Sequence, residues 1–99
     1  MAETQSDTIT RTEITYPNRY NVVFINDDFT PMDFVVQLLV EVFNKTLEEA
    51  KDVTLQIHEK GKGIAGSYNY ELAEQKKAEA VAISRNNGHP LTILVEKIE

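Results

Sequence analysis

An asparagine and two aspartates, residues 26–28, stand where a predicted strand gives way to a predicted helix. The strand is the β-prone apolar run at residues 20–25. The helix begins at Thr30 and Pro31, which we expect to be its N-cap and its first residue. Carboxylate and amide oxygens at such a corner suit the capture of a small cation such as an amino group. The same residue types also form ordinary acidic turns, so the spacing alone leaves both interpretations open.

His58 is the second candidate for chemistry, because it stands near the predicted C-terminus of the second helix. A histidine there can be a helix-dipole partner, a packed side chain or part of a site. His58 and His89 do not match a zinc-binding spacing, so we expect no metal and no cofactor. Catalysis by Asp27 or Asp28 with His58 has no supporting substrate or oxyanion motif. We therefore favour a binding module over an enzyme and keep a small hydrolase as an alternative.

Residues 61–66 read G-x-G-x-x-G, the pattern of a dinucleotide-binding loop. That loop must follow a strand and open a helix, so that a pyrophosphate meets the helix N-terminus. Here the pattern follows a predicted helix and leads into a predicted strand. We interpret it as a glycine turn followed by a close approach of two backbone segments.

Composition predicts one ordinary globular domain, since 41% of the 99 residues are hydrophobic and 26% are charged. The absence of cysteine excludes disulfides, thiolate zinc sites and a cysteine nucleophile. A net charge of −6 argues against nucleic acid as a partner. No apolar stretch has the length of a membrane span, and the N-terminus lacks the pattern of a signal peptide. We therefore expect a cytoplasmic protein with no membrane partner.

Hydrophobic periodicity predicts three strands and three helices. The strands are expected at residues 20–25, 63–68 and 91–95, and the helices at about 31–44, 46–60 and 70–86. The order β-α-α-β-α-β predicts the α+β class, as a two-layer sandwich with the three helices on one face of a three-stranded sheet. The segment 1–17 is polar and aperiodic, so we expect a disordered arm ahead of one domain at 18–99.

Local signals mark where the helices begin and end and which faces they bury. Thr46 opens a capping box, Gly61 ends the second helix, and Asn69 can cap the third. Small residues on the third helix, Ala73 and Ser84 among them, allow close packing against the sheet. The expected apolar faces are Val35, Leu38, Leu39, Val42 and Phe43 on the first helix and Leu47, Ala50, Thr54 and Ile57 on the second.

Several motifs together closely resemble the ClpS family, the adaptor proteins of the bacterial N-end rule. They are NDDFTPMDFVV at 26–36, IH at 57–58, GSY at 66–68, AEQK at 73–76 and NGHPL at 87–91. The resemblance runs in order over about residues 20–97. It implies recognition of proteins whose first residue is leucine, phenylalanine, tyrosine or tryptophan, with no chemistry performed. It also implies a monomer that hands these proteins to the N-terminal domain of a AAA+ unfoldase, ClpA or a relative.

The resemblance also implies roles for individual residues. Asn26, Asp27 and His58 would surround the α-amino group of the bound N-terminus. Met32 would act as a gate against β-branched first residues, and Thr54 stands where many members have methionine. The rim would be formed by Asp28, Thr30 and Pro31, and the side-chain pocket by Met32, Val35, Thr54, Ile57 and Leu91.

Contact with the unfoldase is the last expectation that comes from the resemblance. Glu71 and Lys76 match family contact positions, although two solvated charges would look the same. The arm at residues 1–17 would engage the unfoldase during delivery. A generic protein-interaction domain like the C-terminal domain of the ribosomal stalk shares the element order and remains an alternative. It predicts no joint use of Asn26, Asp27 and His58.

Overall fold

The strand that precedes the acidic corner lies at the centre of the sheet. In the computed structural model, which describes residues 18–98, β2 (Tyr20–Ile25) pairs antiparallel with both β3 (Lys62–Tyr68) and β4 (Thr92–Lys97). The strand order is therefore β3-β2-β4. Val23 at the middle of β2 pairs with Ile64 on one side and Leu94 on the other.

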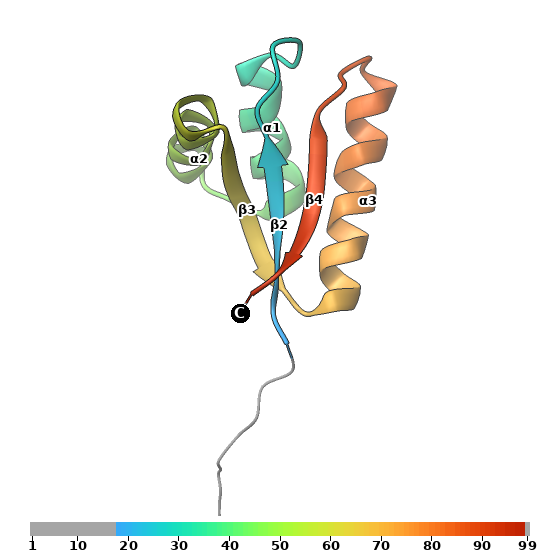
Figure 1. Cartoon of the computed structure of the whole chain (residues 1–99). Coiled ribbons are helices and arrows are strands. Elements are labelled where there is room, and N and C mark those ends of the chain that lie inside the picture. The colour runs from blue at the N-terminus through green and yellow to red at the C-terminus, as the bar shows by residue number, and fades with distance from the viewer. Residues whose placement is uncertain (1–17, 99) are drawn as a thin grey trace, which may run out of the picture.

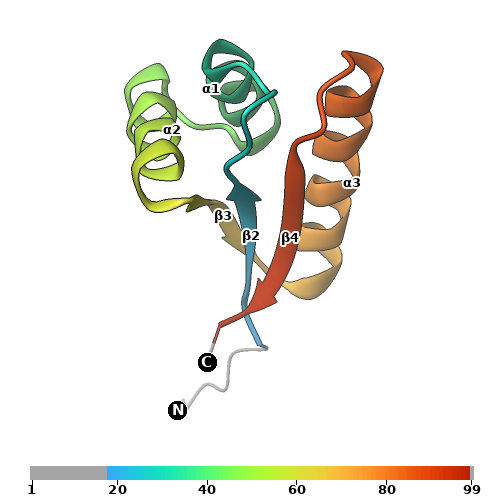
Figure 2. The same ribbon diagram turned by 45° about the horizontal axis from the view of Figure 1, so that its top comes forward.

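Three helices cover one face of this sheet: α1 (Met32–Phe43), α2 (Leu47–Lys60) and α3 (Tyr70–Asn86). Figures 1 and 2 show α1 between α2 and α3, with the opposite face of the sheet left open. The predicted α+β class and the order β-α-α-β-α-β are confirmed. Among residues 18–98, no helix has both the length and the apolar character needed to cross a membrane.

The core forms where α1 packs against the inner side of β2. Val22 and Phe24 of β2 are fully buried, and so is Leu39 of α1. The rings of Phe24 and Phe43 meet edge to face, with centroids 5.4 Å apart. All five residues of the apolar face expected on α1 are buried, whereas Leu47 on α2 is 58% exposed. Leu47 is the first residue of its helix, and the buried residues of α2 begin one turn later, at Ala50.

The expected helix caps are present with one exception, the start of α1. Asn69 accepts a hydrogen bond from the N–H of Leu72, as a cap should. At α1 the N-cap is Pro31, whose carbonyl accepts from the N–H of Val35 at 3.2 Å. The prediction that Thr30 caps the helix and that Pro31 is its first residue is wrong. The hydroxyl of Thr30 donates instead to the carboxylate of Asp27, a charged and therefore stronger acceptor.

The glycines at residues 61–66 shape the approach of α2 to the sheet. Gly61 caps α2 with a φ of +90°, a left-handed conformation that favours glycine. A Cβ added at Gly63 would lie 2.7 Å from Cγ1 of Ile57, so this position admits no side chain without movement of Ile57. The G-x-G-x-x-G pattern thus corresponds to a glycine turn at Gly61 and a close approach of β3 to α2 at Gly63.

The domain division expected from the sequence reaches beyond the part of the chain that the structure describes. The predicted arm at residues 1–17 and the last residue of the predicted domain, Glu99, lie outside residues 18–98. The division at residue 18 therefore stays a prediction.

The capping box of α2 gives a direct test of what stabilises this helix. The N–H of Glu49 donates to Oγ1 of Thr46 at 3.1 Å, and the N–H of Thr46 donates to the Glu49 carboxylate at 2.9 Å. We expect Thr46→Ala to lower the free energy of unfolding by about 1 kcal/mol in urea titrations, because one helix N–H loses its partner. Thr46→Ser keeps the acceptor and should unfold like the parent. Equal destabilisation by both changes would contradict this role.

Candidate functional site

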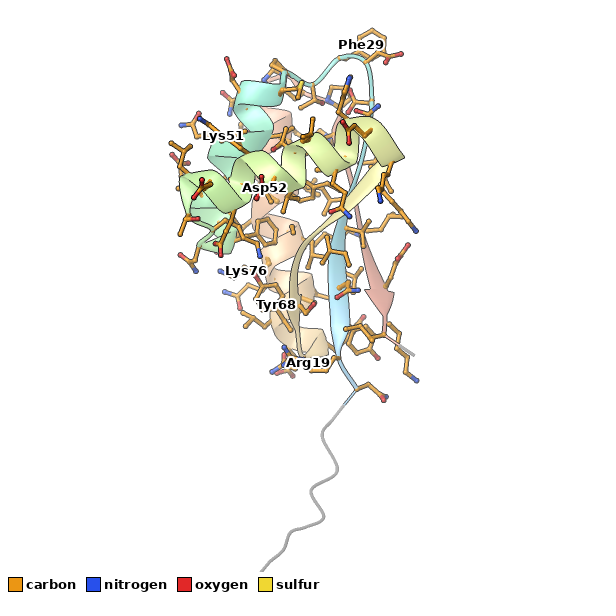
Figure 3. The ribbon with its side chains drawn as sticks, turned by 90° about the vertical axis from the view of Figure 1, so that its left-hand side faces the viewer. Arg19, Phe29, Lys51, Asp52, Tyr68 and Lys76 are labelled. Carbon is orange, nitrogen blue, oxygen red and sulfur yellow. The ribbon has the colours of Figure 1, made fainter. Side chains whose placement is uncertain are left out.

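The loop between β2 and α1 is organised by the carboxylate of Asp27. Its Oδ1 accepts hydrogen bonds from the N–H groups of Phe29 and Thr30, at 2.7 and 2.8 Å. Its Oδ2 accepts from the hydroxyl of Thr30 at 2.9 Å. The acidic turn suggested by residues 26–28 is therefore real, and it holds the segment that leads into α1. Phe29 stands at the tip of this loop, as Figure 3 shows, and the residue is 79% exposed.

The same hydrogen bonds determine the charge of Asp27. Partial burial acts to raise the pKa of Asp27, but this effect is outweighed. Hydrogen bonds from Phe29 and Thr30, with a smaller electrostatic contribution from His89, hold the pKa of Asp27 below its usual value of 3.8. Asp27 is therefore ionised at neutral pH and places a fixed negative charge in the loop.

One backbone hydrogen bond brings this loop to the end of α2. The N–H of Asn26 donates to the carbonyl of Gly61 at 2.9 Å. Because Gly61 caps α2, the bond places Asn26 next to the turn that carries His58. Both Asn26 and His58 are exposed, so their polar groups are open to a ligand.

Thr54 and Ile57 lie on the same face of α2 as His58 and are buried, 3% and 4% exposed. The hydroxyl of Thr54 donates to the carbonyl of Ala50 at 2.8 Å, within its own helix. This buried hydroxyl is thus satisfied locally and does not need a ligand as a partner.

These segments enclose a pocket with about 280 Å³ of empty volume, including the solvent at its mouth. Nine of the residues predicted for the amino-group site, the rim and the side-chain pocket line it. The lining residues are Ile25, Asn26, Asp27, Thr30, Met32, Val35, Thr54, Ile57, His58 and Leu91.

Two of the predicted residues do not line the pocket, and one residue that was not predicted does. Asp28 and Pro31, expected at the rim, are exposed and do not line the pocket. Ile25 lines it and was not predicted. Its signal was present in the sequence, because Ile25 is the last apolar residue of the strand that runs directly into Asn26.

The pocket has two chemically distinct parts. Asn26, Asp27 and His58 supply an amide, a carboxylate and an imidazole. In the apolar part, Val35, Ile57 and Leu91 are buried, between 1% and 5% exposed, whereas Met32 is 47% exposed at the start of α1. The arrangement fits a small amphipathic ligand with one cationic end and one apolar end. Among residues 18–98, no group of three or more His, Cys, Asp or Glu side chains could hold a metal ion.

The two residues expected to contact an unfoldase lie away from this pocket, on α3. Glu71 is in the first turn and exposed. Lys76 is partly buried, and its ammonium group donates to the carbonyl of Val42 at 2.7 Å. That carbonyl is one of the last in α1, where a helix leaves carbonyls without partners and favours a cation. Lys76 therefore ties α3 to the C-terminus of α1.

Fold and pocket together define a small α+β domain with an amphipathic pocket assembled from loop, helix and strand ends. The family model described as "ATP-dependent Clp protease adaptor protein ClpS" matches residues 15–94. The chain belongs to the ClpS family. This is an adaptor family, so the protein is an adaptor and not an enzyme, as the sequence predicted.

Relatives match along nearly the whole chain. The ATP-dependent Clp protease adapter protein ClpS of Deinococcus radiodurans is 44% identical over 95 residues, which cover 96% of this chain and 84% of the relative. The protein of the same name from Helicobacter hepaticus is 42% identical over 98 residues and 99% of each chain. Among solved structures, Agrobacterium tumefaciens ClpS2 bound to L-phenylalaninamide is similar with a TM-score of 0.80 and 30% identity, covering 84% of this chain and all of that one.

The ionised turn predicts how stability depends on pH. Since the pKa of Asp27 is lower in the folded state than in an unfolded chain, its contribution is present above about pH 4 and is lost as the pH falls below that value. We expect Asp27→Asn to lower the free energy of unfolding by about 1 kcal/mol at pH 7, because the Thr30 hydroxyl loses its charged acceptor. In urea titrations the difference from the parent should shrink between pH 5 and pH 2.

Asp28→Asn is the matched control for this experiment. It removes the same charge from the neighbouring residue, whose side chain is exposed. Its unfolding at pH 7 should stay close to that of the parent. An equal loss of stability in the two variants would mean that net charge, and not the hydrogen-bonded turn, is responsible.

Proposed function

We propose that this pocket binds the free N-terminus of a protein whose first residue is bulky and hydrophobic: leucine, phenylalanine, tyrosine or tryptophan. The observation that carries the proposal is the joining of an ionised, polar end and an apolar end of buried side chains in one pocket. A free N-terminus differs from every internal residue by its α-ammonium group. A site that reads both the ammonium and the first side chain therefore needs both ends at once.

The polar end has acceptors left for an ammonium group. Oδ2 of Asp27 accepts one hydrogen bond from within the loop, and a carboxylate oxygen can accept two. The exposed side chains of Asn26 and His58 offer an amide oxygen and an imidazole nitrogen. An ammonium taken from water needs several such partners, because a buried charge without them is costly. This supports the role of Asn26, Asp27 and His58 as the amino-group site.

The apolar end would supply the preference for the first side chain. Filling such a pocket with a leucine or phenylalanine side chain contributes roughly 1.5–3 kcal/mol, which is enough to separate these residues from alanine or serine. Met32 stands half exposed at the start of α1, a position that suits a gate at the mouth. Thr54 lines the pocket where the resemblance to the family implies a larger methionine, and this difference bears on the ranking among the four side chains.

A solved relative supports the same chemistry. Agrobacterium tumefaciens ClpS2 was determined with L-phenylalaninamide, a molecule with a free α-amino group, a benzyl side chain and an amide where a peptide would continue. The amino group and the benzyl side chain of such a ligand are complementary to the polar and apolar ends of the pocket in the present protein.

Peptide binding followed by fluorescence anisotropy tests the proposal. A peptide that begins with free phenylalanine should bind, whereas its N-acetylated twin and an alanine-first peptide should each bind at least about tenfold more weakly, since each loses more than about 1.4 kcal/mol. His58→Ala should weaken the free phenylalanine peptide by removing one acceptor. Equal binding of all three peptides, or of none, would favour a generic interaction domain like that of the ribosomal stalk.

We further propose that the adaptor delivers these proteins to a AAA+ unfoldase, ClpA or a relative. The membership in a Clp protease adaptor family supports a partner of this kind. Glu71, exposed at the start of α3, is the better candidate for the contact, because the ammonium group of Lys76 already binds the end of α1. The pocket and Glu71 lie on different elements, so substrate and unfoldase can be held together.

Delivery can be separated from substrate binding. Removal of residues 1–17 should leave affinity for the phenylalanine peptide intact and abolish degradation of a phenylalanine-first protein by unfoldase and peptidase. Glu71→Lys should reduce the affinity for the isolated N-terminal domain of the unfoldase, measured by calorimetry, while Glu48→Lys on α2 makes the same charge change elsewhere and should not. Full degradation with the truncated protein would refute the role of the arm.

A further inference from the structure

The loop from α3 to β4, residues 87–91, is held by one side chain that lies outside the pocket. Arg85 is in the last turn of α3, and its Nη1 donates to the carbonyl of His89 at 2.9 Å and to the carbonyl of Leu91 at 3.0 Å. The two carbonyls stand on either side of Pro90. A single guanidinium nitrogen therefore bridges the proline.

The position of Pro90 explains why a side chain is needed there. Proline has no N–H and a fixed φ, so this part of the loop cannot close a backbone hydrogen bond through it. Backbone bonds secure only the first half of the loop: the N–H of Gly88 donates to the carbonyl of Arg85, and the N–H of His89 donates to the carbonyl of Ser84 at 2.8 Å. From the carbonyl of His89 to that of Leu91, just before β4, the loop is held by hydrogen bonds from the guanidinium of Arg85.

This second half of the loop ends in a pocket residue. Leu91 is 1% exposed and lines the apolar end with Val35 and Ile57. Two residues earlier, the ring of His89 packs edge-on against Phe34 of α1, with centroids 4.5 Å apart. Besides the backbone bonds of its first half, the loop is thus held by ring packing on α1 and by the two bonds from Arg85. Of the side-chain hydrogen bonds in this loop, the one that reaches the backbone of Leu91 comes from Arg85.

We propose that Arg85 is a positioning residue that fixes Leu91, and thereby sets the shape of the apolar end of the pocket. This inference deepens the proposed function and rests on it for its effect on peptide affinity. Its partners are backbone carbonyls, and the planar guanidinium offers several donors in a fixed geometry, which a lysine ammonium does not. Loss of these bonds would leave the carbonyls of His89 and Leu91 without this donor and the backbone at Leu91 less constrained.

Arg85→Ala in the full chain tests the proposal, and Arg19→Ala is its matched control. Arg19 also donates a guanidinium hydrogen bond to a carbonyl, that of Ser67 at 2.9 Å. It does so at the end of the sheet away from the loop that carries Phe29, as the labels in Figure 3 show. The two variants lose the same kind of side chain, but only one of them loses a contact with the pocket.

The first readout is the methyl signals of Leu91 in NMR spectra of the ligand-free proteins. They should shift in Arg85→Ala and stay in place in Arg19→Ala. The second readout is the dissociation constant for the phenylalanine-first peptide, which should rise about three- to tenfold in Arg85→Ala only, the range expected for losing hydrogen bonds that hold a contact surface. Arg85→Lys keeps the charge and N–H donors but loses their fixed planar geometry, so it should lie between the parent and Arg85→Ala.

Unchanged Leu91 methyl signals in Arg85→Ala and Arg85→Lys would overturn the proposal. So would an unchanged dissociation constant in the same variants when the parent binds the peptide. If the parent does not bind the peptide at all, the proposed function fails, and the methyl signals still decide whether Arg85 positions Leu91.

Discussion

The carboxylate of Asp27 is the interaction on which the site depends. It accepts three hydrogen bonds from Phe29 and Thr30 and so fixes the path from β2 into α1. That path determines where α1 begins, and therefore where Met32 and Val35 stand relative to the end of the sheet. The same hydrogen bonds keep the carboxylate ionised. One side chain thus supplies both the geometry of the loop and the negative charge at the polar end of the pocket.

The pocket is built where three chain segments converge. The loop after β2 meets the end of α2 through the bond from Asn26 to the carbonyl of Gly61. Gly61 can cap α2 because it adopts a positive φ, and Gly63 lets β3 approach Ile57 closely. The third segment is the loop before β4, which contributes Leu91 to the lining of the same pocket. Each of the three segments also connects consecutive elements of the fold, so the pocket needs no additional segment of chain.

The charged residues of α3 have a different place in the molecule. Lys76 bonds the end of α1 and so belongs to the packing of two helices, while Glu71 remains exposed at the start of α3. A sequence shows both as charges on one helix, and only the structure distinguishes them. For an adaptor, the consequence is that the proposed substrate pocket and the candidate partner residue Glu71 lie on different parts of the fold. The two proposed interactions can therefore be altered by separate substitutions.

The sequence by itself determined the class of the fold, the order of the elements and most of their ends. These follow from local physics: the apolar period of α1, the capping box at Thr46 and the glycine at the end of α2. The motifs at residues 26–36 and 57–58 also indicated the family, and with it nine of the residues that line the pocket. The predicted N-cap of α1 was wrong. The hydroxyl of Thr30 could bond either to the helix backbone or to a neighbouring side chain, and it donates to the carboxylate of Asp27.

Only the tertiary structure decided what lies side by side. Whether the face with Met32 meets the face with Ile57 depends on how α1 and α2 pack over β2, and no local pattern contains that information. Ile25 had a signal in the sequence, but its place in the pocket depends on neighbours that folding brings together. The contacts of Arg85 depend on the loop geometry around Pro90. Spacing in a sequence predicts which residues share one helix or strand. Contacts between elements depend on packing of the whole core, which is a property of all its residues together.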